Sequence, residues 1–226
     1  VVSATLPRLL NPRAAFAQID SQKIGPALVD PRQIDSWLAI TPDGLVTFYT
    51  SKVELGTGTI TALAQLVAEE LDLPFKNIKM VQGDTSSSIE QGSTVGSRTI
   101  ERAGPQIRQA AAAARQELLK LAASRLNAPA DKLTVLDGVV SVAGEPAKKV
   151  SYGELIGGKK FNTKITASGT GWDMKVAPEV RAKDPKQYKV VGQSVQRIEL
   201  PAKVTGEHDY IHDVRIPGML HGRVVR

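Results

Sequence analysis

The sequence has 226 residues, of which 42% are hydrophobic and 4% aromatic, so it can form one large or two small domains packed mainly through small aliphatic side chains. It contains no cysteine, which excludes disulfides, zinc knuckles and iron–sulfur clusters bound by this chain. The net charge of +6 would suit a nucleic-acid partner. The basic residues are scattered, however, and no aromatic platform is interleaved with them, so we expect no nucleic acid.

Residues 1–36 are predicted to be an N-terminal arm that carries the remainder of an export signal. Residues 1–18 contain no acidic side chain, and the sequence AFA at 15–17 precedes Gln18 in the pattern of a signal cleavage site. An ordinary irregular arm is the alternative. No apolar run in the sequence is long enough to span a bilayer.

Alternating apolar and polar residues predict two β-hairpins and one further strand. The first hairpin covers residues 37–51 around TPDG at 41–44, where Pro at the second position and Gly at the fourth favour a type I turn. The strand is expected at 77–84. The second hairpin covers 133–142 around DG at 137–138, which is typical of a type I′ turn.

Apolar residues at helical spacing predict two helices, one over residues 59–74 and one over residues 101–126. In the first helix, Glu69 and Glu70 are expected to face solvent, and a solvated face is favoured over a catalytic carboxylate pair. The expected buried positions of the two helices are Ile60, Leu63, Ala64, Val67 and Leu71 in the first, and Ile107, Ala111, Ala114, Leu118 and Leu121 in the second.

The predicted fold class is α+β, with a β-hairpin and a mixed sheet packed with two main helices in residues 37–156. Residues 157–186 are rich in Gly, Lys, Thr and Ser, and are expected to be a linker or a long loop. Residues 187–226 contain short β-like runs without helical periodicity, and are expected to be a smaller β-rich segment. Strand edges without partners invite association, so we expect another chain to cover this segment.

No motif for nucleophilic or zinc-dependent catalysis is present, since the chain lacks G-x-S-x-G and H-E-x-x-H. His208 and His212 are four residues apart, but their segment has no helical pattern, so they are not expected to share a face. We therefore predict neither a metal site nor a catalytic residue in this chain.

Two glycine loops that each lead into a predicted helix are the remaining candidates for a binding site. The loop ELGTGT at 54–59 and the loop QGSTVGSR at 91–98 combine small residues with the free N–H groups and positive dipole of a helix N-terminus. Such a pair suits an anionic group, although either loop alone could be an ordinary tight turn. Arg98 could bind an oxyanion or pair with Glu90 or Glu101 instead. The candidate binding residues are Leu55, Gly56, Thr57, Gly58, Ser93, Thr94, Gly96, Ser97 and Arg98.

These loops belong to a longer stretch that resembles a known family. VELGTG at 53–58, GST at 92–94, YGEL at 152–155, KVTG at 203–206 and DVRIPGML at 213–220 occur in the order found in the molybdenum-cofactor-binding large subunits of the xanthine dehydrogenase and aldehyde oxidase family. The chain is most similar to the isoquinoline 1-oxidoreductase β-subunit type, which includes periplasmic aldehyde dehydrogenases. The resemblance implies a molybdenum-cofactor-binding domain, followed by the start of a small hammerhead-like α/β domain in 187–226.

The resemblance also implies an oxidoreductase that oxidises aldehydes or N-heterocycles with water as the oxygen source. The implied cofactor is molybdopterin with Mo, in the cytosine dinucleotide form, with no iron–sulfur cluster or haem on this chain. The implied partners are a chain carrying the remaining molybdenum domains, a [2Fe-2S] small subunit and, as a further candidate, a c-type cytochrome subunit. A twin-arginine export signal and a periplasmic location complete the expectation.

Two departures from the family pattern leave an alternative open. The family usually has glutamine between the two glycines of the first loop, where this chain has Thr57. The family's catalytic glutamate lies in a GxGE segment, which this sequence lacks, as it lacks the GGGFG cofactor loop. The chain is therefore expected either to supply cofactor-binding loops to a larger enzyme, or to be a non-catalytic assembly or binding module that has lost the cofactor contact.

Overall fold

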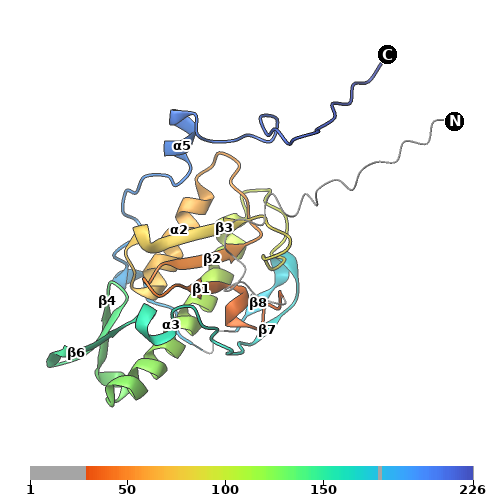
Figure 1. Cartoon of the computed structure of the whole chain (residues 1–226). Coiled ribbons are helices and arrows are strands. Elements are labelled where there is room, and N and C mark those ends of the chain that lie inside the picture. The colour runs from red at the N-terminus through yellow and green to blue at the C-terminus, as the bar shows by residue number, and fades with distance from the viewer. Residues whose placement is uncertain (1–28, 178–179, 226) are drawn as a thin grey trace. The chain divides into compact units, whose positions relative to one another are not determined.

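The computed structural model describes residues 29–177 and 180–225, so the predicted export-signal remnant in 1–18 lies outside the described residues. The chain divides into two compact units, Val1–Gln193 and Ser194–Arg226, which we describe separately. Helices and small sheets are mixed along the first unit, which confirms the predicted α+β class (Figure 1).

The central sheet is mixed, as predicted, and contains β1 (Leu38–Ile40), β2 (Val46–Thr50) and β3 (Ile78–Gln82). β1 and β2 form the expected hairpin, and the Gly44 N–H donates to the Thr41 carbonyl at 2.9 Å to close its turn. β2 then pairs with β3 in parallel over the full length of both strands. The carboxyl ends of β2 and β3 consequently lie at the same edge of the sheet.

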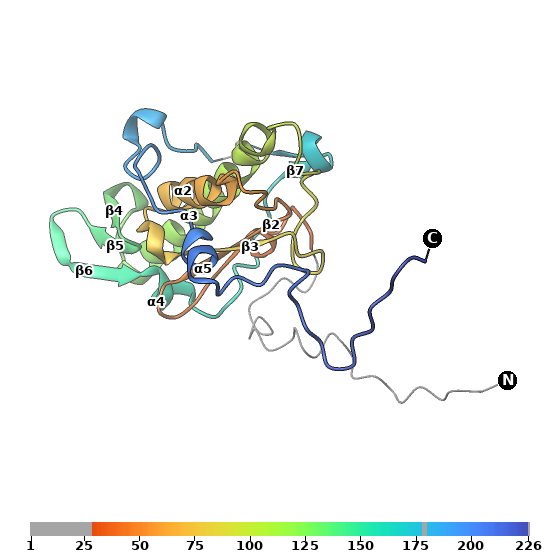
Figure 2. The ribbon, with the colours of Figure 1, turned by 90° about the horizontal axis from the view of Figure 1, so that it is seen from above.

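Two helices pack with this sheet and lie beside each other in both views (Figures 1 and 2). α2 (Thr59–Leu71) ends at Asp72, which adopts a left-handed conformation two residues before the proline expected to stop the helix. α3 (Gly104–Leu126) follows directly on a π-helical turn, Thr99–Ala103. The presence of both predicted helices is thus confirmed, although α2 ends three residues before the predicted limit at residue 74 and α3 starts three residues after residue 101.

One expected core position in α3 is wrong. Leu121 is 37% exposed, whereas Ala122 is fully buried. The helix advances 3.6 residues per turn, so the position four residues after Leu118 continues the buried stripe and the position three residues after it falls on the stripe's edge. The other predicted core residues of α3 are buried as expected.

The second sheet is antiparallel throughout and consists of β4 (Leu133–Leu136), β5 (Val139–Val142) and β6 (Glu145–Ser151). The predicted type I′ turn between β4 and β5 is confirmed, because Asp137 and Gly138 both have positive φ, +51° and +74°. The remaining short elements of the first unit are the helix α4 (Tyr152–Ile156), the strands β7 (Ala167–Ser168) and β8 (Lys175–Val176), and 3-10 turns at Ile34–Ser36, Phe75–Asn77, Ala130–Lys132, Gly171–Asp173 and Pro185–Gln187.

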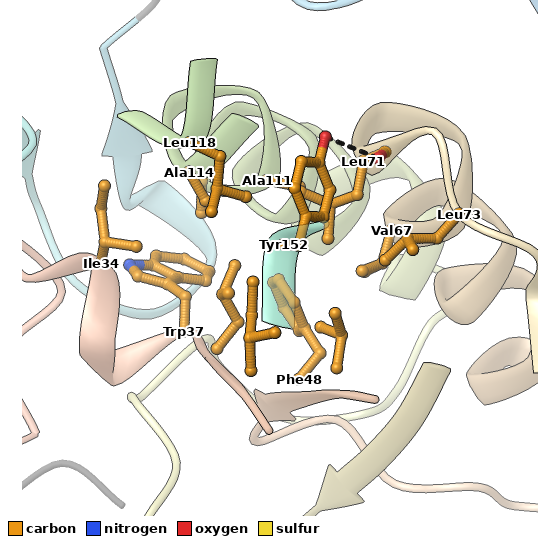
Figure 3. Close-up of a cluster of buried hydrophobic side chains, with 14 of the residues drawn as sticks. Ile34, Trp37, Phe48, Val67, Leu71, Leu73, Ala111, Ala114, Leu118 and Tyr152 are labelled. Atoms are coloured by element: carbon orange, nitrogen blue, oxygen red, sulfur yellow. Dashed lines mark hydrogen bonds between the residues drawn. The ribbon is translucent and has the colours of Figure 1, made fainter. Parts of the chain in front are cut away.

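A single hydrophobic core joins the sheets and the helices (Figure 3). Trp37 and Phe48 from the hairpin face the alanine-rich side of α3, where small side chains leave room for the two large rings. Tyr152 enters the same core from α4, and its hydroxyl donates to the Leu71 carbonyl at 3.1 Å. The core therefore fixes the end of α2, the hairpin and the second sheet to one another.

The expectation that Glu69 and Glu70 face solvent is wrong, since their exposed fractions are 2% and 1%. The Glu69 Oε2 atom accepts the backbone N–H groups of residues 189–191 at 2.7–3.0 Å. A polar helix face usually predicts contact with water. The same carboxylates can instead accept hydrogen bonds from the backbone N–H groups of another chain segment that packs on the helix. We call this segment, residues 183–193, the strap.

Two further carboxylates hold the other end of the strap. The Glu70 carboxylate accepts the backbone N–H of Lys183 at 3.0 Å and the Arg108 guanidinium at 2.8 Å. Asp72 pairs with Arg115 at 2.7 Å and with the Lys183 ammonium at 2.5 Å. Carboxylates of α2 and the residue after it therefore bind the strap along its length.

The second unit contains the short helix α5 (Leu200–Thr205) and no strand among its described residues, so the expected β-rich character of 187–226 is wrong for this chain alone. Pro201 suits the first turn of this helix, because proline lacks the N–H that a helix start leaves unpaired. Apolar β-like runs need a neighbouring strand to complete their hydrogen bonds, and Ile211 and Val225 remain more than 90% exposed. In the described part of the chain, no helix has both the length and the apolar character needed to span a membrane.

The buried tyrosine predicts a dependence of stability on alkaline pH. Burial raises the pKa of the Tyr152 phenol well above its ordinary value. Above pH ~10 the unfolded state therefore loses a proton that the folded state keeps, and stability falls as pH rises. Tyr152→Phe should be less stable by about 1 kcal/mol at pH 7. That gap should narrow by about 1.4 kcal/mol per pH unit above ~10 in denaturant titrations. Parallel pH profiles would contradict this assignment.

The strap gives a second prediction. Glu69→Ala leaves three consecutive, partly buried N–H groups without their acceptor, so we expect a loss of about 3 kcal/mol and faster tryptic cleavage within residues 183–193. Glu117→Ala is the matched control, because Glu117 makes an i,i+3 pair with Lys120 worth less than about 0.5 kcal/mol. Equal stability and equal cleavage of the two variants would show that Glu69 does not hold the strap.

Candidate functional site

The two glycine loops meet at one edge of the central sheet. The first loop, residues 51–58, follows β2 and leads into α2, and the second loop, residues 83–98, follows β3 and leads toward α3. Because β2 and β3 are parallel, both loops leave the sheet at the same edge (Figure 1). In open sheets with parallel strands, ligands bind at this carboxyl edge.

The first loop is open on its outer side. Leu55 is 63% exposed, and Gly56 and Thr57 are also exposed. Gly56 has φ of +89°, and a Cβ built on it would meet no atom within 4 Å. Gly58 has φ of +77°, which turns the chain into α2. The free space around Gly56 leaves room for a ligand to approach the backbone.

The anion at the start of α2 is supplied by the chain itself. The Glu54 carboxylate accepts the N–H of Gly58 at 2.8 Å and the N–H of Ile60 at 3.2 Å. These are amides that we expected to face a bound anion. A carboxylate suits this position because of the positive end of the helix dipole. Gly58 therefore contributes to the loop through its conformation, while its N–H is already engaged.

The second loop is held from beneath by a buried lysine. Lys52 has no exposed surface, and its Nζ atom donates to the carbonyls of Gly92 at 2.7 Å and Ser93 at 3.0 Å. Burial lowers the pKa of the Lys52 ammonium, and the nearby Glu90 carboxylate opposes this shift. The Val53 N–H also donates to the Thr94 hydroxyl oxygen at 3.1 Å. The first loop and the second loop are thus directly bonded to each other.

A chain of buried amide side chains continues this support into the protein. Gln91 accepts a hydrogen bond from the Thr50 hydroxyl at 2.6 Å and donates to Gln106 of α3 at 3.0 Å. Gln106 in turn donates to the carbonyl of Met174 at 3.0 Å. Fully satisfied buried amides of this kind rigidify the segments that they join. The start of the second loop is therefore fixed to both β2 and α3.

Trp172 supports the second loop from the side. Its indole N–H donates to the Ser93 carbonyl at 2.9 Å, and the Arg98 guanidinium carbon lies 5.0 Å from the centroid of its ring. A Cβ at Gly92, where φ is +79°, would lie 2.2 Å from the indole ring, so this glycine is required by packing. Arg98 thus rests on an aromatic face, while Glu101 pairs with Arg102 at 3.2 Å.

The outer side of both loops carries backbone donors without acceptors. Among the described residues, no atom accepts the N–H groups of residues 93–97, and the same is true of Leu55, Gly56, Thr57 and Thr59. Ser93, Ser97 and Arg98 are exposed beside these amides. Ser97 has φ of +58°, which is uncommon for serine. Neutral N–H donors, hydroxyls and one guanidinium together suit a ligand rich in anionic oxygen atoms.

The structure therefore brings all the sequence-predicted site residues to one edge of the sheet. It also adds supporting residues that the sequence did not reveal, namely Lys52, Glu54, Gln91, Gln106 and Trp172. The sequence did contain a signal that could have identified Trp172 as a supporting residue, because it is one of two tryptophans and lies in a glycine-containing segment. In the described part of the chain, no cluster of three or more histidine, aspartate or glutamate side chains could hold a metal ion.

Comparisons with known proteins agree on one family. The family model described as "Molybdopterin cofactor-binding domain" matches residues 17–212. A nicotinate dehydrogenase subunit of Pseudomonas putida is 39% identical over 198 residues, which are 88% of this chain and 16% of that protein. The beta subunit of isoquinoline 1-oxidoreductase from Brevundimonas diminuta is 30% identical over 216 residues, covering 83% of this chain and 28% of that protein.

A third relative has a name that points to a different cofactor. The membrane-bound aldehyde dehydrogenase [pyrroloquinoline-quinone] of Gluconacetobacter polyoxogenes is 29% identical over 192 residues, covering 83% of this chain and 23% of that protein. This chain thus spans between 16% and 28% of the length of these three relatives.

Proposed function

The chain belongs to the molybdopterin cofactor-binding domain family of xanthine dehydrogenase and aldehyde oxidase large subunits, and we propose that it supplies two cofactor-binding loops to a molybdenum hydroxylase. The observation that carries this proposal is the row of backbone N–H groups in residues 93–97 that find no acceptor among the described residues. They lie in a loop that is bonded to the first loop through Val53 and Thr94, and the first loop is open around Gly56. A pyrophosphate-bearing pterin cofactor has the anionic oxygens that such donors bind.

The residues of the two loops have distinct proposed roles. The glycine at position 56 lets the backbone approach the cofactor closely, because a side chain would occupy that space. The hydroxyls of Ser93 and Ser97 add donors, and Arg98 places a positive charge at the edge of the site. The full proposed set is Leu55, Gly56, Thr57, Gly58, Ser93, Thr94, Gly96, Ser97 and Arg98. When bound, molybdopterin with Mo would supply the redox chemistry, and this chain would bind and orient the cofactor.

The proposed reaction is the oxidation of an aldehyde or an N-heterocycle, with water as the source of oxygen. The names of the relatives support this range, since they refer to nicotinate, isoquinoline and aldehyde as substrates. We propose molybdopterin over a quinone because the family model describes a molybdopterin-binding domain. The catalytic glutamate is proposed to lie on a segment or partner chain outside these residues.

The assembly proposed for this enzyme follows from the same family. It contains a chain with the remaining molybdenum domains, a [2Fe-2S] small subunit and a c-type cytochrome subunit. The proposed cofactor form is the cytosine dinucleotide, and the proposed location is the periplasm, reached by twin-arginine export. The acid-free residues 1–18 support export, because signal segments are typically free of acidic side chains.

A non-catalytic assembly module of the same fold is the second candidate. Two observations favour it, namely threonine at position 57 in place of glutamine and the engagement of the first helix amides by Glu54. Such a module would fold in the same way and hold no cofactor. Cofactor content therefore separates the two candidates.

The test compares two glycine variants of the complex purified with its partner chains. Gly56→Ala and Gly144→Ala replace glycines of similar φ, +89° and +84°, and neither new Cβ meets an atom within 4 Å. Both variants should lose a similar stability, about 1 kcal/mol, from the left-handed backbone. Only Gly56→Ala should lose molybdenum and pterin, by roughly tenfold, because only its methyl group would press on a bound cofactor.

The outcomes distinguish the candidates clearly. Wild-type complex without molybdenum or pterin would support the non-catalytic module. Equal cofactor content in Gly56→Ala and Gly144→Ala would show that the first loop is an ordinary tight turn.

A further inference from the structure

We propose that Lys52 is a positioning residue, which sets the direction of the Ser93 and Thr94 N–H groups for binding the anionic part of the cofactor. This inference rests on the proposed function and extends it to a residue beneath the site. Lys52 does not touch the proposed ligand space itself, since it is fully buried below the second loop. Its effect is exerted through two peptide planes.

The geometry of the trans peptide carries the argument. In a trans peptide the C=O and the following N–H point in opposite directions. No peptide bond in the described chain is cis. The Lys52 ammonium draws the carbonyls of Gly92 and Ser93 inward, at 2.7 and 3.0 Å, so the N–H groups of Ser93 and Thr94 must point away from it. These two N–H groups are among those without an acceptor in the described chain.

The burial of Lys52 shows that its charge serves the second loop. No carboxylate among the described residues lies within ion-pair distance of its ammonium group, and the only acceptors of that group are the two loop carbonyls. An apolar side chain of similar length would fill the same volume without the free-energy cost of burying a charge. A lysine here therefore serves the two loop carbonyls, which would lose this donor if the side chain were apolar.

Trp172 gives the same peptide plane a second donor. Its indole N–H donates to the Ser93 carbonyl at 2.9 Å, in addition to the bond from Lys52. The Ser93 carbonyl thus accepts one bond from beneath and one from the side, which leaves the Thr94 N–H little freedom to turn inward. The ammonium charge beneath the loop also favours an anion bound above it.

The experiment measures molybdenum and pterin per complex, together with the unfolding midpoint. Lys52→Met keeps the apolar length and removes both donors, and we expect roughly tenfold lower cofactor content. Tyr152→Phe is the matched control, because it removes a buried hydrogen bond far along the chain from the loops, and it should load like wild type. Trp172→Phe removes the indole donor to Ser93 while keeping an aromatic ring beside Arg98, and should lower the content by a smaller factor. Lys52→Arg keeps donors at this position and should restore loading.

The possible outcomes separate a positioning role of Lys52 from a general effect on stability. Wild-type cofactor content in Lys52→Met would overturn the proposal and leave the proposed function standing. Equal losses in Lys52→Met and Tyr152→Phe would also overturn it, because they would show a general effect of destabilisation. If Lys52→Met does not fold, Trp172→Phe decides, and full loading of that variant would count against the proposal. Wild-type complex without molybdenum and pterin would overturn both the proposed function and this inference.

Discussion

The parallel pairing of β2 with β3 is the constraint on which the candidate site depends. Parallel strands end at the same edge, so the residues that follow Thr50 and the residues that follow Gln82 are forced together. α2 gives the chain its crossover between the two strands, and α2 and α3 share one hydrophobic core with the sheet. An antiparallel arrangement of the same strands would place the loops at opposite edges. The glycines of the two loops would then have no common ligand.

Charged side chains that are buried or half-buried in this protein bind several backbone groups. Glu54 and Glu69 accept backbone N–H groups, whereas Lys52 donates to backbone carbonyls. Glu69 and Lys52 in this way hold segments without regular secondary structure, and Glu54 accepts N–H groups at the start of α2. Residues 93–97 of the second loop, by contrast, keep their N–H groups free of acceptors within the described chain. These N–H groups are the donors that we propose for an external acceptor.

Local patterns in the sequence predicted most of the elements. The TPDG turn, the type I′ turn at Asp137 and the two helices follow from backbone preferences and apolar spacing, which act over a few residues. The burial of Glu69 could not be predicted, because the strap that covers it is about 120 residues away in the sequence. Neither could the helix α5, since apolar β-like runs alone do not reveal whether a partner strand is present. The prediction that Leu121 is buried was wrong because this residue lies at the margin of the buried stripe of α3.

The candidate site, like the fold, could be predicted from the sequence only in part. Glycines before helices predicted where the loops are and that they meet. The sequence could not show which amides are already engaged, because Lys52, Glu54 and Trp172 contact the loops through side chains whose reach depends on the tertiary fold. The sequence also predicted that a bound ligand supplies the anion at the start of α2. In the structure, the Glu54 carboxylate supplies it from within the chain.

The most direct test of the central claim is amide hydrogen exchange in residues 93–97. The measurement compares the cofactor-loaded complex with the same complex after the cofactor has been removed. Binding by these N–H groups predicts that their exchange slows by at least about tenfold on loading, while amides in β4 and β5 are unchanged. Exchange at 93–97 that is equally fast in both states would contradict the claim that the second loop binds the cofactor through its backbone.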